Sequence, residues 1–344
     1  MRTIAGYHVL HPQKDRAAYM DALMAADLVS TATYPDGFDA IVEDIAELVR
    51  KKMAADNKKP MAITLGANYV GLLEYYQNHL DGLLSEEEKA FQRQFVPLVA
   101  SIIYRSSSYA SGEQLAKDPL AVQGDDWDYL QVEQSAFRFG EEYELPKFFL
   151  PEDDILKLMT LKIWIGNTLH CSYAFLGHYY GLSYTCESAR NDYVSRCAYY
   201  ASDEGYTALA HKFGLPLPRP KEEEEEIWHF YRNEALKDSL LRVAADPIRK
   251  LGRNERFIGP ALMCLEYDVI PAFICHNAAY GFTYKNEADP TSLSLLNMVA
   301  QRGIEAAVEE VCGLDLSKEG ERLIHRLIVA SYREICDYNP TNAF

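Results

Sequence analysis

The chain has 344 residues, which is long for one hydrophobic core and predicts two domains. Hydrophobic residues make up 48% and charged residues 25%, proportions that exclude a disordered or fibrous protein. A net charge of -17 would repel a phosphate backbone and so excludes nucleic acid as a partner. No apolar run approaches the ~18 residues of a membrane helix, so we expect a cytoplasmic protein that does not bind membranes.

The first part of the chain alternates between short apolar runs and amphipathic stretches. This order is typical of a parallel sheet whose strands are joined by crossover helices, and it predicts an α/β domain over residues 1–145. The predicted strands are residues 3–10, 27–33, 61–65 and 98–104, and the predicted helices are residues 15–25, 36–55 and 69–80.

The second part, residues 146–344, has the apolar period of long helices and predicts an all-α domain. Its first helix is predicted from residue 153 to about residue 180. We expect the boundary between the two domains within residues 140–150. Five acidic residues, Glu222 to Glu226, follow Pro220, and this position predicts the first turn of a further helix, where negative charge is stabilising.

Seven cysteines are scattered along the sequence, and none belongs to a Cys-x2-Cys pair. Their odd number and their spacing are not those of a disulfide framework or a zinc site. We therefore expect reduced, mostly buried thiols and no bound metal.

A lysine stands in the middle of the apolar run of residues 161–170, which is an unusual place for a charge. At 100° per residue, Asn167 lies about 140° and His170 about 80° around the helix from Lys162, so the three side chains share one broad arc. Gly166 costs the helix roughly 1 kcal/mol against alanine, which predicts a close approach to the backbone there.

This set of side chains has the chemistry needed to oxidise a secondary alcohol. Lys162 can take the hydroxyl proton if burial lowers its pKa by about two or three units. Asn167 is a neutral donor for the developing oxyanion, and His170 can orient the substrate. The alternative is that Lys162 extends to solvent, Asn167 bonds to a neighbouring helix and His170 is a core histidine.

The spacing of Lys162, Asn167 and His170 is Lys-x4-Asn-x2-His, which resembles the signature of the polyol-specific long-chain dehydrogenases, the family of mannitol dehydrogenase and mannitol-1-phosphate 5-dehydrogenase. The likeness extends in order through residues 26–32, 118–120 and 246–251 and includes Arg256 and Pro260. Together these segments span most of the chain.

The resemblance implies a Rossmann-like dinucleotide-binding domain followed by a helical substrate domain. It implies transfer of hydride, without metal and with NAD or NADP as cofactor, between a polyol or polyol phosphate and its ketose. Lys162 would be the general base, His170 would hold a substrate hydroxyl, and Asn68 and Asn167 would stabilise the oxyanion. The implied cofactor-binding residues are Thr31, Ala32 and Asn68.

A basic cluster, Arg242, Arg249, Lys250, Arg253 and Arg256, is prominent in so acidic a chain. Arginine forks suit a phosphate or several hydroxyls, and the resemblance favours Arg242 and Lys250, with Arg249 beside them, as substrate contacts. The alternative is that these cations pair with the acidic run 222–226 or with Glu255.

The chain departs from the family in having no G-x-G-x-x-G fingerprint for the dinucleotide. Residues 3–10 read as a strand from the middle of the domain, so an N-terminally truncated Rossmann-like domain is expected. Near the site, Ala67 precedes Asn68 where an acidic residue is expected, Tyr104-Arg105 replaces an Asp-Arg pair, and Leu169 replaces a glycine.

Two explanations remain open for the missing fingerprint. In the first, the sequence starts at an internal methionine or is cut short, and the whole protein is a dehydrogenase. In the second, the chain is a natural non-catalytic relative that binds a polyol or sugar phosphate. In the second case, self-association could cover the exposed sheet edge. A hexuronate reductase of the same wider family is a third alternative.

Overall fold

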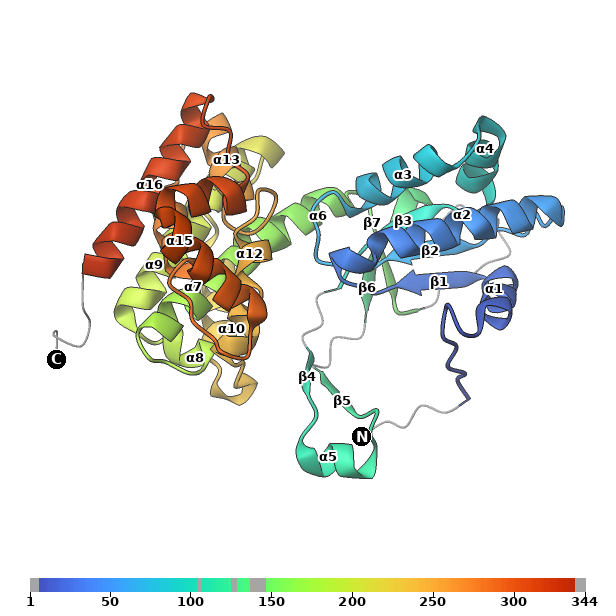
Figure 1. Cartoon of the computed structure of the whole chain (residues 1–344), viewed down its shortest axis with the longest axis horizontal. Helices are drawn as coiled ribbons and strands as arrows, with labels where there is room; N and C mark the ends of the chain where they lie inside the picture. Colours follow the sequence, from blue (N-terminus) through green and yellow to red (C-terminus); the bar gives the residue numbers. More distant parts are fainter. Residues whose placement is uncertain (1–5, 104–106, 125–128, 137–146, 338–344) are drawn as a thin grey trace. The chain divides into compact units, whose positions relative to one another are not determined.

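The computed structural model describes residues 6–103, 107–124, 129–136 and 147–337. The chain divides into two compact units, Met1–Leu158 and Met159–Phe344. The first contains a sheet with helices and the second is helical, as Figure 1 shows, so the predicted order of an α/β part and an all-α part is confirmed. Most of the predicted junction, residues 140–150, lies outside the described residues, and the domain limits at 145 and 146 stay a prediction.

A five-stranded sheet forms the centre of the first unit. Its strands are β1 (Leu28–Thr31), β2 (Ala62–Leu65), β3 (Leu98–Ile102), β6 (Leu130–Glu133) and β7 (Phe149–Glu152), in the order β1-β2-β3-β6-β7. Neighbouring strands are parallel except β3 and β6, which are antiparallel. Two further strands, β4 (Ser107–Tyr109) and β5 (Val122–Gly124), pair with each other on either side of α5 (Gly112–Lys117).

Helices pack on one face of the sheet. They are α1 (Arg16–Ala25), which precedes β1, and the connecting helices α2 (Phe38–Ala54), α3 (Leu72–Leu83) and α4 (Glu86–Phe95). Because side chains alternate along a strand, Ile63 and Leu65 pack against these helices, whereas Ala62 packs with Val99 and Val132 on the other face. The expected strands at 27–33, 61–65 and 98–104 correspond to β1, β2 and β3, although Tyr104 itself lies outside the described residues.

The strand predicted at residues 3–10 is wrong over its described part. Residues 6–10 are not assigned to a strand, and Tyr7 and Val9 are 54% and 81% exposed. An apolar alternation forms a strand only where a neighbouring strand pairs with it and a core covers one face. Neither is present for Gly6 to Leu10 among the described residues.

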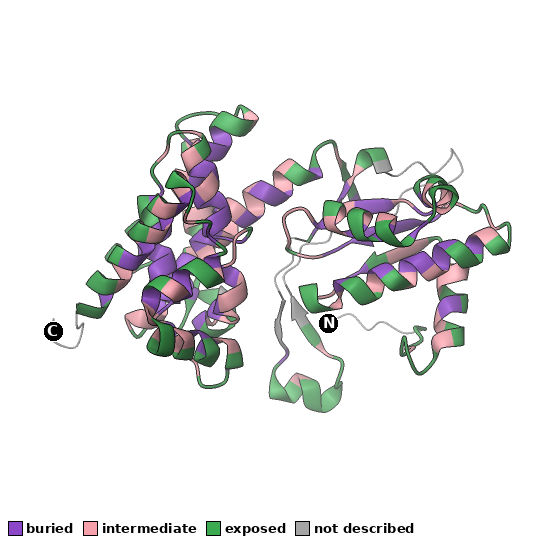
Figure 2. Ribbon diagram, turned by 45° about the horizontal axis from the view of Figure 1, so that its top comes forward, coloured by how far each residue is buried: buried purple, intermediate pink, exposed green. Residues whose placement is uncertain are grey.

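The second unit is built around the buried helix α7. Seven of its residues, from Cys171 to Gly177, are buried in succession, because α9, α11 and α14 pack against it from different sides. Figure 2 shows the buried residues concentrated on the inward faces of these helices. Helix α6 (Ile155–Leu161) crosses the division after Leu158. The helices that follow it are α7 (Asn167–Tyr179), α8 (Thr185–Ser188), α9 (Asp192–Phe213), α10 (Lys221–Arg232), α11 (Leu240–Ala244), α12 (Pro247–Lys250), α13 (Ile258–Glu266), α14 (Ala272–Gly281), α15 (Pro290–Cys312) and α16 (Glu319–Asp337).

Several smaller predictions can be compared with this unit. Acidic residues Glu222, Glu223 and Glu224 occupy the first turn of α10, as expected from the sequence. All seven cysteines are free thiols, and only Cys336 is exposed.

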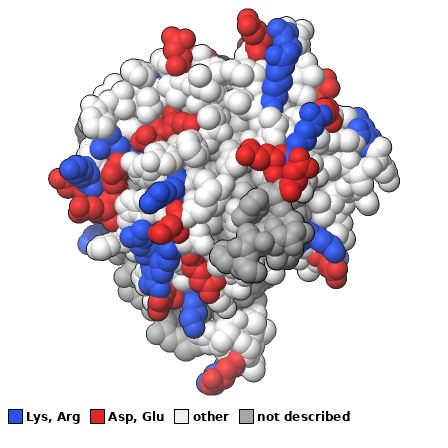
Figure 3. Space-filling model, turned by 90° about the vertical axis from the view of Figure 1, so that its left-hand side faces the viewer, with Lys and Arg blue, Asp and Glu red and all other residues white. Residues whose placement is uncertain are grey.

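The face of the helical unit seen in Figure 3 carries acidic and basic side chains next to each other rather than in a patch of one sign. Within the described ranges, no helix is both long enough and apolar enough to cross a membrane.

Candidate active site

The helix that carries the candidate site is interrupted by a π-helical turn at Lys162–Gly166, between α6 and α7. The backbone N–H of Asn167 donates to the carbonyl oxygen of Lys162, five residues earlier. The sequence predicts one regular helix here, and the π turn corrects that prediction. The relative directions estimated for Lys162, Asn167 and His170 at 100° per residue therefore do not hold. Turns of this kind are rare in helices and occur frequently at functional sites.

Neighbouring side chains hold the π turn in place. The Tyr231 hydroxyl donates to the carbonyl oxygen of Gly166 at 3.3 Å, and the indole N–H of Trp164 donates to the carbonyl oxygen of Asn254 at 3.2 Å. The Thr168 hydroxyl donates to the Trp164 carbonyl oxygen at 2.9 Å. Two of these bonds reach carbonyl oxygens of the turn itself and the third fixes the Trp164 side chain, so the turn is tied to its surroundings.

Gly259 of α13 provides the space for Trp164. A Cβ atom at Gly259 would lie 2.6 Å from the indole ring, whereas a Cβ atom at Gly166 would meet no described atom within 4 Å. The backbone of Gly166 is approached at its carbonyl oxygen by Tyr231, but no described atom lies near its Cβ position, so packing requires a glycine at Gly259 rather than at Gly166.

Gly259→Ala is expected to lower the free energy of unfolding by about 1–3 kcal/mol, because the added methyl group overlaps the Trp164 ring in a packed interior. Thermal or urea unfolding measures the loss. Gly166→Ala is the matched control, since the same methyl group there meets open space. Equal destabilisation by the two substitutions would contradict the packing described.

Lys162 has the protonation behaviour of a base. Burial lowers the pKa of its ammonium group from 10.5 to about 8, and the positive charge of Arg256 lowers it further in the same direction. Roughly a tenth of the molecules then carry a neutral amine at pH 7, against fewer than about one in a thousand for an exposed lysine.

His170 is held by an acidic side chain that the sequence analysis did not single out. His170 Nε2 lies 3.0 Å from Asp238 Oδ2, and the ring of Tyr231 packs against the imidazole with 5.2 Å between centroids. Burial lowers the pKa of His170, so the imidazole is neutral near pH 7. Burial also opposes ionisation of Asp238, but the hydrogen bonds from His170 and Arg242 hold its pKa at about 2.

Most of the basic cluster is paired with carboxylates. Arg242 donates from Nε and Nη2 to both oxygens of Asp238, at 2.7 and 2.6 Å. Arg249 and Arg256 both contact Glu255, at 3.1 and 2.7 Å. The remaining pairs are Arg249 with Asp246 and Arg253 with Glu321. The alternative of pairing with Glu255 is thus correct for two arginines, and no ion pair in the described ranges joins the cluster to the acidic run 222–226.

Lys250 differs from these arginines. Its side chain is buried, with 6% of the residue exposed, and its ammonium group makes no hydrogen bond or ion pair within the described part of the chain. Burial lowers its pKa from 10.5 to about 8. The positive charge of Arg256 lowers the pKa values of Lys162, His170 and Lys250. All three residues therefore lie near Arg256.

In the first unit, the predicted cofactor-binding residues lie at the carboxyl ends of two parallel strands. Thr31 ends β1 and Ala32 follows it, whereas Asn68 stands three residues after β2. The N–H of Gly66 donates to the Thr31 carbonyl oxygen at 3.0 Å, and a Cβ atom at Gly66 would lie 2.7 Å from that oxygen. Nucleotides bind at this edge of open parallel sheets, so the position of these residues fits a dinucleotide.

The sequence profile of the mannitol dehydrogenase C-terminal domain matches residues 154–331 of this chain. The chain belongs to the mannitol dehydrogenase family. The fold is similar to that of Pseudomonas fluorescens mannitol 2-dehydrogenase, solved as a ternary complex with NAD and D-mannitol, at 14% identity and a TM-score of 0.69 over 94% of this chain and 75% of that chain. It is also similar to a substrate-free D-sorbitol dehydrogenase, at 13% identity and a TM-score of 0.65 over 95% and 76% of the two chains.

Membership of the mannitol dehydrogenase family confirms the resemblance inferred from the sequence. The matched region contains Lys162, Asn167 and His170 together with the basic cluster, whereas Asn68, Thr31 and Ala32 lie before it. Of the departures from the family pattern, Leu169 is buried in the core around α7, and Tyr104-Arg105 lies outside the described residues.

The sequence did not indicate that Asp238 and Tyr231 contact His170, or that the charge of Arg256 acts on Lys162, His170 and Lys250. Arg256 was visible as a member of the basic cluster, but Asp238 gives no signal in the sequence. Among the described residues, no three His, Cys, Asp or Glu side chains are grouped so as to hold a metal ion.

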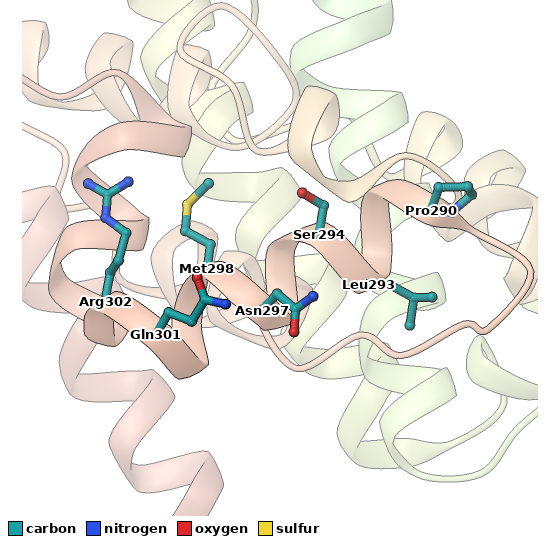
Figure 4. A pocket seen from close by; sticks show the side chains of 7 residues that line it. All are labelled: Pro290, Leu293, Ser294, Asn297, Met298, Gln301 and Arg302. Atoms are coloured by element: carbon teal, nitrogen blue, oxygen red, sulfur yellow. The ribbon is translucent and has the colours of Figure 1, made fainter.

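A shallow depression on the surface of the helical unit is lined by other residues than the candidate site. Figure 4 shows that its side chains come from one helix, α15. They include Leu293, Asn297 and Gln301, and none of the predicted site residues lines it.

Proposed function

We propose that this chain is an NAD(P)-dependent oxidoreductase that interconverts a polyol and its ketose, with Lys162 as the general base. The observation that carries the proposal is Lys162 itself, a partly buried lysine on a π turn with a pKa of about 8. It supports proton abstraction because a base works best when its pKa is near the working pH. Membership of the mannitol dehydrogenase family supports the reaction class, and the similar mannitol 2-dehydrogenase was solved with NAD and D-mannitol.

In the proposed reaction, the neutral amine of Lys162 accepts the proton of the substrate hydroxyl. Asn167 donates to the oxygen on which negative charge develops, and His170 binds a neighbouring hydroxyl. Asn68 is proposed as the second donor to this oxygen only because the sequence resembles the family. Thr31, Ala32 and Asn68 would hold NAD or NADP, and the bound cofactor would supply the hydride acceptor. The residue types leave the choice between the two cofactors open.

The charge balance of the site favours an uncharged polyol over its phosphate. A phosphate dianion needs several free cationic donors, but Arg242, Arg249, Arg253 and Arg256 are already paired with carboxylates. Lys250 is the one member of the cluster without such a partner in the described ranges. Mannitol and fructose are therefore the proposed substrates, rather than mannitol 1-phosphate and fructose 6-phosphate.

We expect kcat/KM for fructose to exceed that for fructose 6-phosphate by about tenfold or more, because a phosphate would displace existing ion pairs. Steady-state oxidation of NADH or NADPH with each ketose measures the ratio. A preference for fructose 6-phosphate that is lost in Arg242→Ala would contradict the assignment and make Arg242 a phosphate ligand.

Lys250 also supports a second candidate, a hexuronate reductase. A single buried cation without a carboxylate partner matches the single carboxylate of a hexuronate. Turnover of tagaturonate or fructuronate, with none of fructose, would favour this candidate. A non-catalytic polyol binder would instead be stabilised thermally by a polyol or its phosphate and would bind no dinucleotide at millimolar concentration.

A further inference from the structure

Asp238 occupies a fixed backbone position immediately before α11. Its carbonyl oxygen accepts hydrogen bonds from the backbone N–H of Thr185 at 2.9 Å and from the Thr185 hydroxyl at 3.2 Å. The adjacent residue, Ser239, forms a β-bridge with Tyr184. The backbone that carries the Asp238 carboxylate is therefore anchored on Tyr184 and Thr185, at the start of α8. This anchoring does not depend on the contacts that the carboxylate makes with His170 and Arg242.

Both oxygens of this carboxylate are occupied. Oδ1 accepts from Arg242 Nε at 2.7 Å, while Oδ2 accepts from Arg242 Nη2 at 2.6 Å and lies 3.0 Å from His170 Nε2. Asp238 thus links a candidate catalytic histidine to a candidate substrate arginine. The hydrogen bonds to Arg242 are charge-assisted and bidentate, the geometry that holds an arginine most rigidly.

The contact determines which nitrogen of His170 carries the proton. An ionised carboxylate can only accept hydrogen bonds, so a neutral imidazole facing it at Nε2 must be protonated there. Nδ1 is then left with a lone pair. The Tyr231 ring also packs against the imidazole, with 5.2 Å between the ring centroids.

We propose that Asp238 is a positioning residue of the polyol site: it fixes His170 as the Nε2–H tautomer, so that Nδ1 accepts a hydrogen bond from a substrate hydroxyl, and it holds the fork of Arg242 away from anionic ligands. The step from tautomer to substrate binding rests on the function proposed above. The step from Asp238 to the tautomer rests on geometry alone, and the two can be tested separately.

The tautomer is tested by NMR of the full chain labelled with 15N-histidine, without substrate or cofactor. His170→Gln identifies the His170 signals among those of the nine histidines. We expect a neutral ring protonated at Nε2 between about pH 7 and pH 8, and a mixture of tautomers in Asp238→Asn, whose side chain can also donate. A ring protonated at Nδ1, or an unchanged spectrum in Asp238→Asn, would overturn the positioning role whatever the enzyme's activity.

The functional consequence is tested by kinetics with mannitol and fructose. Asp238→Asn is expected to lower kcat/KM by about 10- to 100-fold, mainly through a higher KM, and Asp238→Glu should restore part of it because it keeps an ionised acceptor. Glu234→Gln is the matched control: Glu234 also pairs with an arginine, Arg190, but is exposed and away from His170.

The outcomes of the two experiments separate the two proposals. The expected tautomer without turnover in the wild-type chain would reject the proposed function and retain the positioning role. Turnover that Asp238→Asn leaves unchanged would reject the role of Asp238 in substrate binding. If Asp238→Asn lowers the yield of folded protein, Asp238→Glu and the wild-type spectrum still decide the tautomer.

Discussion

Lys162→Met is expected to lower the turnover of polyol by ~10²-fold or more while leaving the protein folded, because it removes the proton acceptor and keeps the apolar stem of the side chain. The replacement also removes a partly buried ammonium group whose pKa is depressed to about 8, so the folded state loses a source of instability. Loss of activity without loss of stability is the combination expected of a catalytic residue.

Steady-state kinetics and thermal unfolding of the same preparations measure both effects. Lys212→Met is the control, since Lys212 is an exposed lysine in the last turn of α9. Unchanged turnover in Lys162→Met would reject Lys162 as the base. Equal losses in the two variants would show that the effect is not specific to the π turn.

Lys250→Met is expected to stabilise the protein at pH 7 and to weaken substrate binding. The pKa of Lys250 is about 8 in the folded chain against 10.5 in an exposed lysine, so the unfolded chain binds this proton more tightly. The resulting destabilisation is fully present below about pH 8 and disappears as the pH rises through 10.5. Its size is on the order of 3 kcal/mol at pH 7 and about 1 kcal/mol at pH 10.

Urea unfolding of the wild-type chain and of Lys250→Met at pH 7 and pH 10 measures this difference, and KM for the polyol measures the functional loss. We expect the stabilising effect of the substitution to shrink at the higher pH. A variant that is less stable than the wild type at pH 7 would indicate that Lys250 makes favourable contacts in the fold. Retention of a buried, unfavourable charge is easiest to understand if the charge serves a ligand.

The parts of the fold with strong periodic patterns could be predicted from the sequence. The apolar runs of β1, β2 and β3 and the amphipathic period of α1 and α2 identify these elements, because each buries one face or both. Helix α4 was missed, since its sequence is mostly polar, although Ser85 and Glu88 form a capping box that signals its start. Strands β6 and β7 are short and are stabilised by pairing with each other and with β3, which no local pattern reveals.

The candidate site was predicted in part. Lys162 and His170 were recognisable because a lysine and a histidine inside an apolar helix require an explanation. The π turn could not be predicted, since it depends on the contacts of Tyr231 and Trp164 with distant backbone. Asp238 lies in a polar segment far along the chain from His170, and only the packing of α11 against α7 brings the two together.

The central claim is that Lys162 acts as a base with a pKa of about 8. The most direct test is the pH dependence of kcat/KM for mannitol oxidation, which reports the protonation of the free enzyme. If Lys162 is the base, kcat/KM rises tenfold per pH unit at low pH, levels off above an apparent pKa near 8, and loses this rise in Lys162→Met. A profile that is flat between pH 6 and pH 9, or one that keeps its shape in Lys162→Met, would contradict it.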